Sequence, residues 1–116
     1  MFLCICPLTS ETRHLIDEVH LSMMKPSAAI INTARGALID EQALIAALQN
    51  KRIAKAALDV QEEEPMREDN PLYTMPNVII TPHMGWRGLE TRQRLLQLVS
   101  ANIEAYMEGT VINRVV

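Results

Sequence analysis

A chain of 116 residues is long enough for one domain with a single hydrophobic core. Its net charge of −3 and pI of about 5.6 give no basic surface, so we expect no nucleic-acid partner. Apolar residues make up 48% of the chain, but no apolar run reaches the length of a membrane span, and the first residues lack the features of a signal peptide. We therefore expect a globular, cytoplasmic protein that contacts no membrane.

The first half of the chain alternates short apolar runs with helical patterns. Phe2–Cys6 is predicted to be a buried strand, and Ser10–Lys25 is predicted to be a helix. Ala28–Asn32 is predicted to be a second strand. Asp40 is a good N-cap residue, so a helix is expected over Glu41–Asn50.

The second half repeats this alternation. Ile53–Val60 and Val78–Thr81 are predicted strands, separated by the acidic, proline-containing loop Gln61–Asn77. Gly88–Met107 is predicted to be the longest helix, with Gly109 just beyond its end. Strands that alternate with helices and lack hairpin turns form βαβ units, hence a parallel sheet with right-handed crossovers. The predicted fold class is therefore α/β.

Three charged residues, Arg35, Glu64 and His83, each follow a predicted strand. The carboxyl ends of parallel strands line one crevice, where ligands bind. Arginine can grip a carboxylate, and a carboxylate can orient a histidine that carries a proton near neutral pH. Taken singly, an arginine before a glycine, such as Arg35, is usually a solvated cation in a loop. A glutamate in an acidic run, such as Glu64, is more often exposed surface, and His83 could be a structural histidine. Their joint order at strand ends favours an active site.

Six motifs occur along the chain: Cys6-Pro7-Leu8-Thr9-x-x-Thr12, Met24-Lys25-Pro26, Ile31-Asn32-Thr33-Ala34-Arg35-Gly36, Ala56-Ala57-Leu58-Asp59-Val60-x-x-x-Glu64-Pro65, Asn70-Pro71-Leu72 and Pro76-Asn77-Val78-Ile79-Ile80-Thr81-Pro82-His83. In order and spacing they closely resemble the D-isomer-specific 2-hydroxyacid dehydrogenases. The resemblance implies that residues 1–116 form the C-terminal half of a dinucleotide-binding domain. This would be a partial Rossmann fold of about four parallel strands flanked by helices.

The same resemblance implies an NAD(P)-dependent oxidoreductase that transfers hydride between the nicotinamide and a small 2-oxo or D-2-hydroxy acid. Hydroxypyruvate or glyoxylate is the substrate we expect, NAD is favoured over NADP by family habit, and a homodimer is expected. Arg35 would grip the substrate carboxylate, His83 would supply the proton and Glu64 would orient His83. Formate dehydrogenases of the superfamily carry glutamine at the position of Glu64, so glutamate favours a hydroxyacid substrate.

Asp59 is expected to contact the nicotinamide carboxamide, and no metal is expected. The full set of residues expected to contact the coenzyme is Cys6, Pro7, Leu8, Thr12, Thr33, Ala34, Arg35, Asp59, His83, Gly85 and Trp86. Cys4 and Cys6 are interpreted as apolar thiols rather than as a disulfide or a metal site.

The chain contains no G-x-G-x-x-G motif, because glycine occurs only at positions 36, 85, 88 and 109. We therefore expect the Gly-rich first half, which holds the pyrophosphate and ribose, and the family's substrate domain to be absent. The 116-residue fragment alone is then expected to be inactive and to self-associate. Two alternatives stay open: a coenzyme-sensing, non-catalytic module of the corepressor type, and a functionless truncated gene product.

Overall fold

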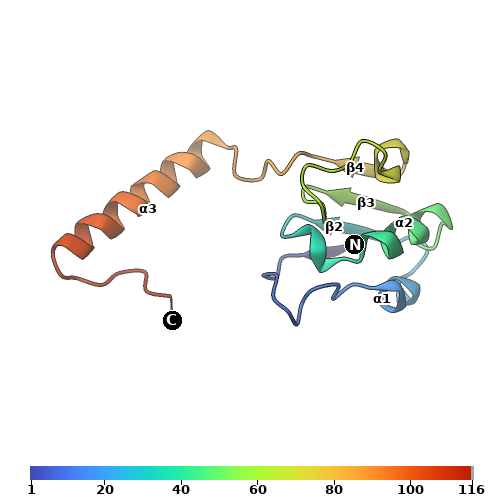
Figure 1. Ribbon diagram of the computed structural model, residues 1–116, viewed down its shortest axis with the longest axis horizontal. Coiled ribbons are helices and arrows are strands. Elements are labelled where there is room, and N and C mark those ends of the chain that lie inside the picture. Colours follow the sequence, from blue (N-terminus) through green and yellow to red (C-terminus); the bar gives the residue numbers. More distant parts are fainter. Residues whose placement is uncertain (116) are drawn as a thin grey trace. The chain divides into compact units, whose positions relative to one another are not determined.

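The computed structural model divides into two compact units, Met1–Met84 and Gly85–Val116, and describes every residue except Val116. The first unit contains a parallel sheet with the strand order β1-β2-β3-β4 (Figure 1). The strands are β1 (Phe2–Cys4), β2 (Ala29–Asn32), β3 (Lys55–Leu58) and β4 (Val78–Ile80). The predicted α/β class and its four parallel strands are confirmed, although each strand is shorter than predicted.

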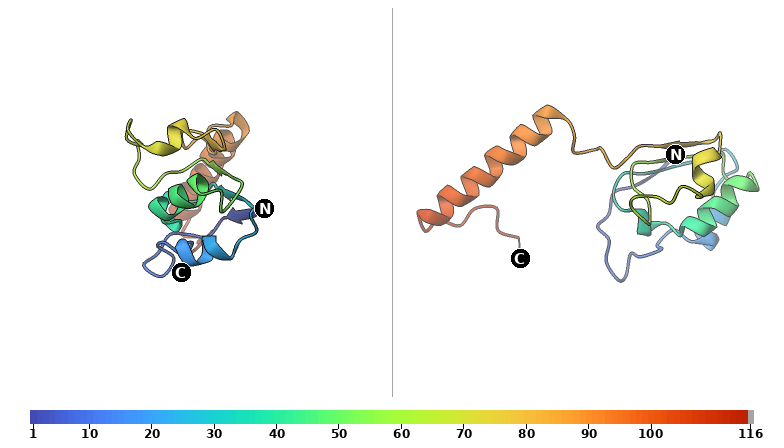
Figure 2. Two further views of the ribbon diagram at one scale, coloured as in Figure 1. Left: turned by 90° about the vertical axis from the view of Figure 1, so that its right-hand side faces the viewer. Right: turned by 45° about the horizontal axis from the view of Figure 1, so that its top comes forward.

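Helix α1 (Glu18–Met23) connects β1 to β2, and helix α2 (Glu41–Gln49) connects β2 to β3. The two helices pack against each other on one face of the sheet (Figure 2). Two short 3-10 helices, η1 (Gly36–Leu38) and η2 (Pro71–Thr74), lie in the loops that follow β2 and β3. Asp40 caps α2 by accepting a hydrogen bond of 3.0 Å from the backbone N–H of Ala43, as predicted.

Alternate residues of each strand face opposite sides of the sheet. On the face that packs against the helices, strand residues such as Ile30, Ala56 and Leu58 are buried in a core with Leu21 and Leu44. The residues paired across the four strands one position along point to the other face of the sheet. This row is Leu3, Ile31, Ala57 and Ile79. Leu3 and Ile79 are 47% and 67% exposed in this row. The helices of the first unit therefore cover only one face of its sheet.

The helix predicted over Ser10–Lys25 is wrong in its first part. Thr12 Oγ1 donates a 2.8 Å hydrogen bond to the Pro7 carbonyl and accepts one of 2.7 Å from the Thr9 backbone N–H, which closes a turn. Threonine hydroxyls compete with helical hydrogen bonds in this way. The helix begins only at Glu18, where Asp17 accepts from the His20 backbone N–H and caps it.

The second unit is built on the long helix α3 (Leu89–Met107). Gly109 has a φ of +71°, its N–H donates to the Tyr106 carbonyl, and the Thr110 N–H donates to the Ala105 carbonyl. These two bonds form the Schellman motif that ends many helices at a glycine, as predicted for Gly109. Among the described residues, no helix is both long and apolar enough to cross a membrane.

Candidate active site

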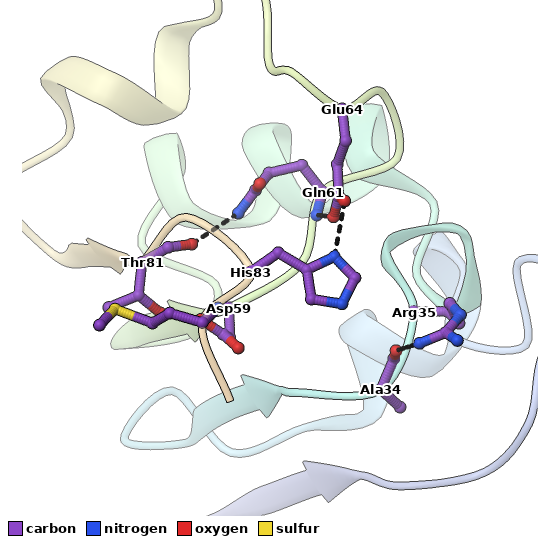
Figure 3. Close-up of polar contacts among 8 residues, drawn as sticks. Ala34, Arg35, Asp59, Gln61, Glu64, Thr81 and His83 are labelled. Carbon is purple, nitrogen blue, oxygen red and sulfur yellow. Dashed lines mark hydrogen bonds and ion pairs between the residues drawn. The ribbon is translucent and has the colours of Figure 1, made fainter. Parts of the chain in front are cut away.

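The loops that follow β2, β3 and β4 carry Arg35, Glu64 and His83, respectively. Because these strands are parallel neighbours, their loops leave the same edge of the sheet. Figure 3 shows His83 between the side chain of Glu64 and the loop that carries Ala34 and Arg35. The structure therefore brings the three predicted catalytic side chains to one place.

Glu64 and His83 form a direct ion pair and hydrogen bond, with 2.7 Å between Glu64 Oε2 and His83 Nδ1. The other oxygen of Glu64 accepts a 2.9 Å hydrogen bond from the backbone N–H of Gln61. Partial burial acts to raise the pKa of Glu64. The hydrogen bonds from His83 and Gln61, with the positive charges of His83 and Arg35, outweigh burial and hold that pKa below its usual value. Glu64 is therefore an anion that fixes the hydrogen of His83 on Nδ1 and directs Nε2 away from itself.

Arg35 is held close to this pair by the tight packing of two loops. A Cβ atom on Gly36 would lie 1.9 Å from the carbonyl carbon and oxygen of Gln61, so only glycine fits at this position. The buried amide of Asn32 shapes the same loop, donating to the Arg35 carbonyl at 2.8 Å and accepting from the Ala34 N–H at 3.1 Å. Arg35 itself is exposed and uses one N–H to bond the Ala34 carbonyl. A guanidinium has five donors, so others can grip a carboxylate.

Asp59 directly follows β3 and is buried, with 8% of its surface exposed. Its Oδ1 accepts hydrogen bonds from the Thr81 hydroxyl at 2.5 Å and from the Met84 backbone N–H at 2.9 Å. Asp59 therefore bonds the loop that carries His83, and the nicotinamide contact predicted for Asp59 stays a prediction.

A cavity of about 530 Å³ lies beside the Glu64–His83 pair. Besides these two residues, its walls are mainly apolar and include Met66, Leu72 and Ile80. Concave, largely apolar surfaces with a few polar groups are typical of small-molecule sites. The Glu64–His83 pair therefore lies at a hollow in the first unit rather than on a flat surface.

The residues expected to contact the coenzyme fall into two groups. Cys6, Pro7, Leu8 and Thr12 follow β1, and Thr33 and Ala34 follow β2, so both sets lie at the same edge of the sheet as Asp59 and His83. Gly85 and Trp86 belong to the second unit, where the Trp86 ring lies 5.3 Å from the Arg92 guanidinium carbon. Coenzyme contact stays a prediction for both groups.

Both cysteines are free thiols. Burial raises the pKa of Cys4 to about 11, with a smaller contribution from nearby Cys6, so Cys4 is an unreactive thiol at neutral pH. This agrees with the interpretation of Cys4 as an apolar residue of the core.

Three polar residues with structural roles at the site were not predicted: Asn32, Gln61 and Thr81. Asn32 and Gln61 are buried, and each of the three bonds a loop that carries a predicted catalytic residue. The available signal was a polar residue at the end of an apolar strand, as in Ala29-Ile30-Ile31-Asn32. Asn32 is buried and bonds the turn that follows it, and the pattern alone does not distinguish this from an exposed polar residue at a strand end.

A parallel α/β sheet with a histidine–carboxylate pair and an arginine at its carboxyl edge is the arrangement of a ligand-binding α/β domain with groups suited to proton transfer. The sequence model of the D-isomer specific 2-hydroxyacid dehydrogenase NAD binding domain matches residues 1–85. The chain belongs to this family, which confirms the predicted resemblance and the nicotinamide coenzyme class of its domain.

Individual relatives agree with this assignment. The chain is 49% identical over 111 residues to a glyoxylate/hydroxypyruvate reductase B from Enterobacter agglomerans, covering 95% of this chain and 34% of the relative. The structure matches a glyoxylate reductase from Paecilomyes thermophila with a TM-score of 0.89 and 40% identity, over 96% of this chain and 34% of that one.

A D-isomer specific 2-hydroxyacid dehydrogenase from Xanthobacter autotrophicus Py2, solved with NADPH and MES, matches with a TM-score of 0.83 and 40% identity. This match covers 96% of our chain and 45% of that one. The chain thus spans about a third of the length of the curated relative that it matches.

Proposed function

We propose that residues 1–116 form the substrate-facing half of the coenzyme domain of an NAD(P)-dependent reductase of small 2-oxo acids. The observation that carries the proposal is the 2.7 Å contact between Glu64 and His83 beside the loop of Arg35. Glyoxylate and hydroxypyruvate are the proposed substrates, because they are named in the enzyme that is 49% identical to this chain.

The three side chains have distinct parts in the proposed reaction. Arg35 grips the carboxylate of the 2-oxo acid with two parallel N–H donors and polarises the neighbouring carbonyl. His83 donates the proton on Nε2 to the carbonyl oxygen as the carbonyl carbon is reduced. Glu64 stabilises the imidazolium and keeps its Nδ1 hydrogen in place. The nicotinamide, when bound, supplies the hydride.

The chemistry of the sheet edge fits the nicotinamide end of such a coenzyme. Cys6, Pro7, Leu8 and Ala34 are small or apolar and suit a flat heteroaromatic ring, and the Asp59 carboxylate can accept from a carboxamide N–H. The chain contains no Gly-rich phosphate loop, so we expect the 116 residues alone to turn over no substrate. We further propose a homodimer in the cytoplasm, where free thiols such as Cys4 and Cys6 are the norm.

The test is NADH or NADPH oxidation with glyoxylate and hydroxypyruvate, in a longer protein that contains this chain and a Gly-rich first half. Replacing His83 by Gln should lower kcat by roughly 10²–10⁴-fold and leave the Kd for the coenzyme nearly unchanged. Replacing Arg35 by Gln should raise KM and lower kcat together.

His20→Gln is the matched control for this experiment. His20 also pairs with a carboxylate, 2.7 Å from Asp17, but on α1 and away from the carboxyl edge of the sheet. This variant should keep full turnover. Coenzyme binding without reduction of any 2-oxo acid would instead identify a coenzyme-sensing module, and unaltered turnover in His83→Gln would reject the proposed proton donor.

A further inference from the structure

The backbone of the loop that carries His83 has an unfavourable conformation. His83 has a φ of +50°, in the left-handed region that residues with a side chain seldom adopt. Its N–H donates to the Thr81 carbonyl at 3.0 Å, across Pro82. Such a conformation persists when contacts with the surrounding structure hold it, and it is often found at functional sites.

The contacts that hold this loop come from the segment that follows β3. Glu64 bonds the imidazole itself, whereas Asp59 bonds the residues on either side of it, through the Thr81 hydroxyl and the Met84 N–H. A single oxygen atom of Asp59 accepts both of these bonds. The Thr81 N–H also continues the strand ladder by donating to the Leu58 carbonyl at 2.9 Å.

We propose that Thr81 is a positioning residue whose hydroxyl, through Asp59, sets the place and orientation of the His83 imidazole. This inference rests on the acid–base role proposed above for His83. Thr81 does not act on the substrate. Its hydroxyl anchors the start of the left-handed turn to a buried carboxylate, while the Met84 N–H anchors the end of the turn to the same oxygen.

The chemistry of this bond explains why a hydroxyl is needed. Hydrogen bonds to a carboxylate are roughly twice as strong as those between neutral groups, and they strengthen when water is excluded. The bond from Gln61 Nε2 to the Thr81 carbonyl is long, at 3.5 Å, and holds the loop weakly. Without the hydroxyl, the start of the turn keeps only its backbone bonds and this long bond from Gln61, and the imidazole is held less firmly against Glu64.

Thr81→Val and Thr81→Ser separate the hydroxyl from the rest of the side chain. Valine keeps the shape of threonine and removes the donor, whereas serine keeps the donor and removes the methyl group. NMR on the 116-residue chain reports the loop directly, through the ring nitrogen shifts of His83 and the exchange rate of the Met84 amide hydrogen.

We expect Thr81→Ser to match the original protein in both readouts. Thr81→Val should shift the Nδ1 resonance and speed exchange of the Met84 amide by about tenfold or more, while the amides of β2 and β3 keep their protection. A change confined to the loop is the signature of positioning. An equal loss of protection across the sheet, or no change at His83, would overturn the proposal.

Thr81→Ala provides the same readout without placing a methyl group beside the Asp59 carboxylate, in case the valine variant does not fold. If valine and alanine both unfold the chain while serine does not, the role of Thr81 is purely structural and the proposal is wrong.

In the longer protein, Thr81→Val should lower kcat by roughly 10–100-fold, with serine restoring it and with little change in KM for the coenzyme. Unaltered turnover in Thr81→Val would contradict the proposal. Failure of the two proposals is distinguishable, because the NMR experiment needs no catalysis. Suppose that Thr81→Val gives the expected NMR changes but that His83→Gln keeps its turnover. The proposed function is then rejected, and the positioning role of Thr81 is not.

Discussion

Gly36 lies so close to the neighbouring loop that its missing side chain sets the spacing of the loops that carry Arg35 and Glu64, two residues proposed for catalysis. An alanine Cβ would meet the Gln61 backbone at 1.9 Å, and a backbone so held cannot give way cheaply. Gly36→Ala should therefore destabilise the fold by at least about 2 kcal/mol in urea denaturation. Gly88→Ala is the control, because its Cβ would meet only the Thr91 side chain, at 3.3 Å, and should cost below about 1 kcal/mol. Equal losses in the two variants would contradict this explanation.

The lowered pKa of Glu64 has a consequence for stability against acid. A carboxyl whose pKa is lower in the folded than in the unfolded state adds stability above its unfolded value of about 4.5. That contribution is lost as the pH falls through the lowered folded pKa. Glu64→Gln should therefore lose less stability than the original protein between pH 7 and pH 3, measured by urea denaturation at each pH. Glu63→Gln is the matched comparison, because it removes the same charge from the next residue and leaves the bond between Glu64 and His83 in place.

At the residue level, the sequence was sufficient to group Arg35, Glu64 and His83, because parallel strand order alone brings strand ends together. It was insufficient for Thr81 and Asn32. Their importance depends on burial and on which backbone group each side chain bonds, and these follow from how loops pack rather than from residue type. The role of Asp59 as an anchor for the His83 loop was missed for the same reason.

Among the elements, α2 was predicted to within one residue and the start of α1 was not. Asp40 precedes a regular apolar pattern and no other residue nearby competes for the cap, whereas Thr9 and Thr12 bond each other and close a turn where a helix was expected. Helix starts that depend on such a competition between side-chain and backbone bonds are hard to predict from pattern alone.

The cap of α2 offers a test at this scale. Asp40→Ala removes the acceptor for the Ala43 N–H and should cost about 1 kcal/mol of folding free energy in urea denaturation. Asp40→Asn retains a side-chain acceptor and should cost only a few tenths of a kcal/mol. If the two variants were equally stable, the side-chain bond would not be what stabilises the start of α2.

At the scale of the whole molecule, the row Leu3, Ile31, Ala57 and Ile79, exposed at Leu3 and Ile79, makes self-association the expected behaviour of the 116-residue chain. Apolar surface that stays in water lowers its free energy by packing against a second copy. Light scattering at micromolar concentration should give a mass above the monomer's 13.1 kDa. Ile79→Lys should shift it towards the monomer, and Glu63→Lys, away from that row, should not. A monomeric original protein would contradict this prediction.

The segment 59–64 touches both neighbouring loops, since Asp59 and Glu64 hold the His83 loop and Gln61 meets Gly36. An insertion or deletion there would misalign the arginine and the histidine together. In the exposed stretch just beyond it, the side chains of Arg67 and Asp69 pair with each other at 2.9 Å. We therefore expect residues 67–69 to accept a fluorescent label, an affinity tag or a longer specificity loop. The chain can be lengthened there without disturbing the residues proposed for catalysis.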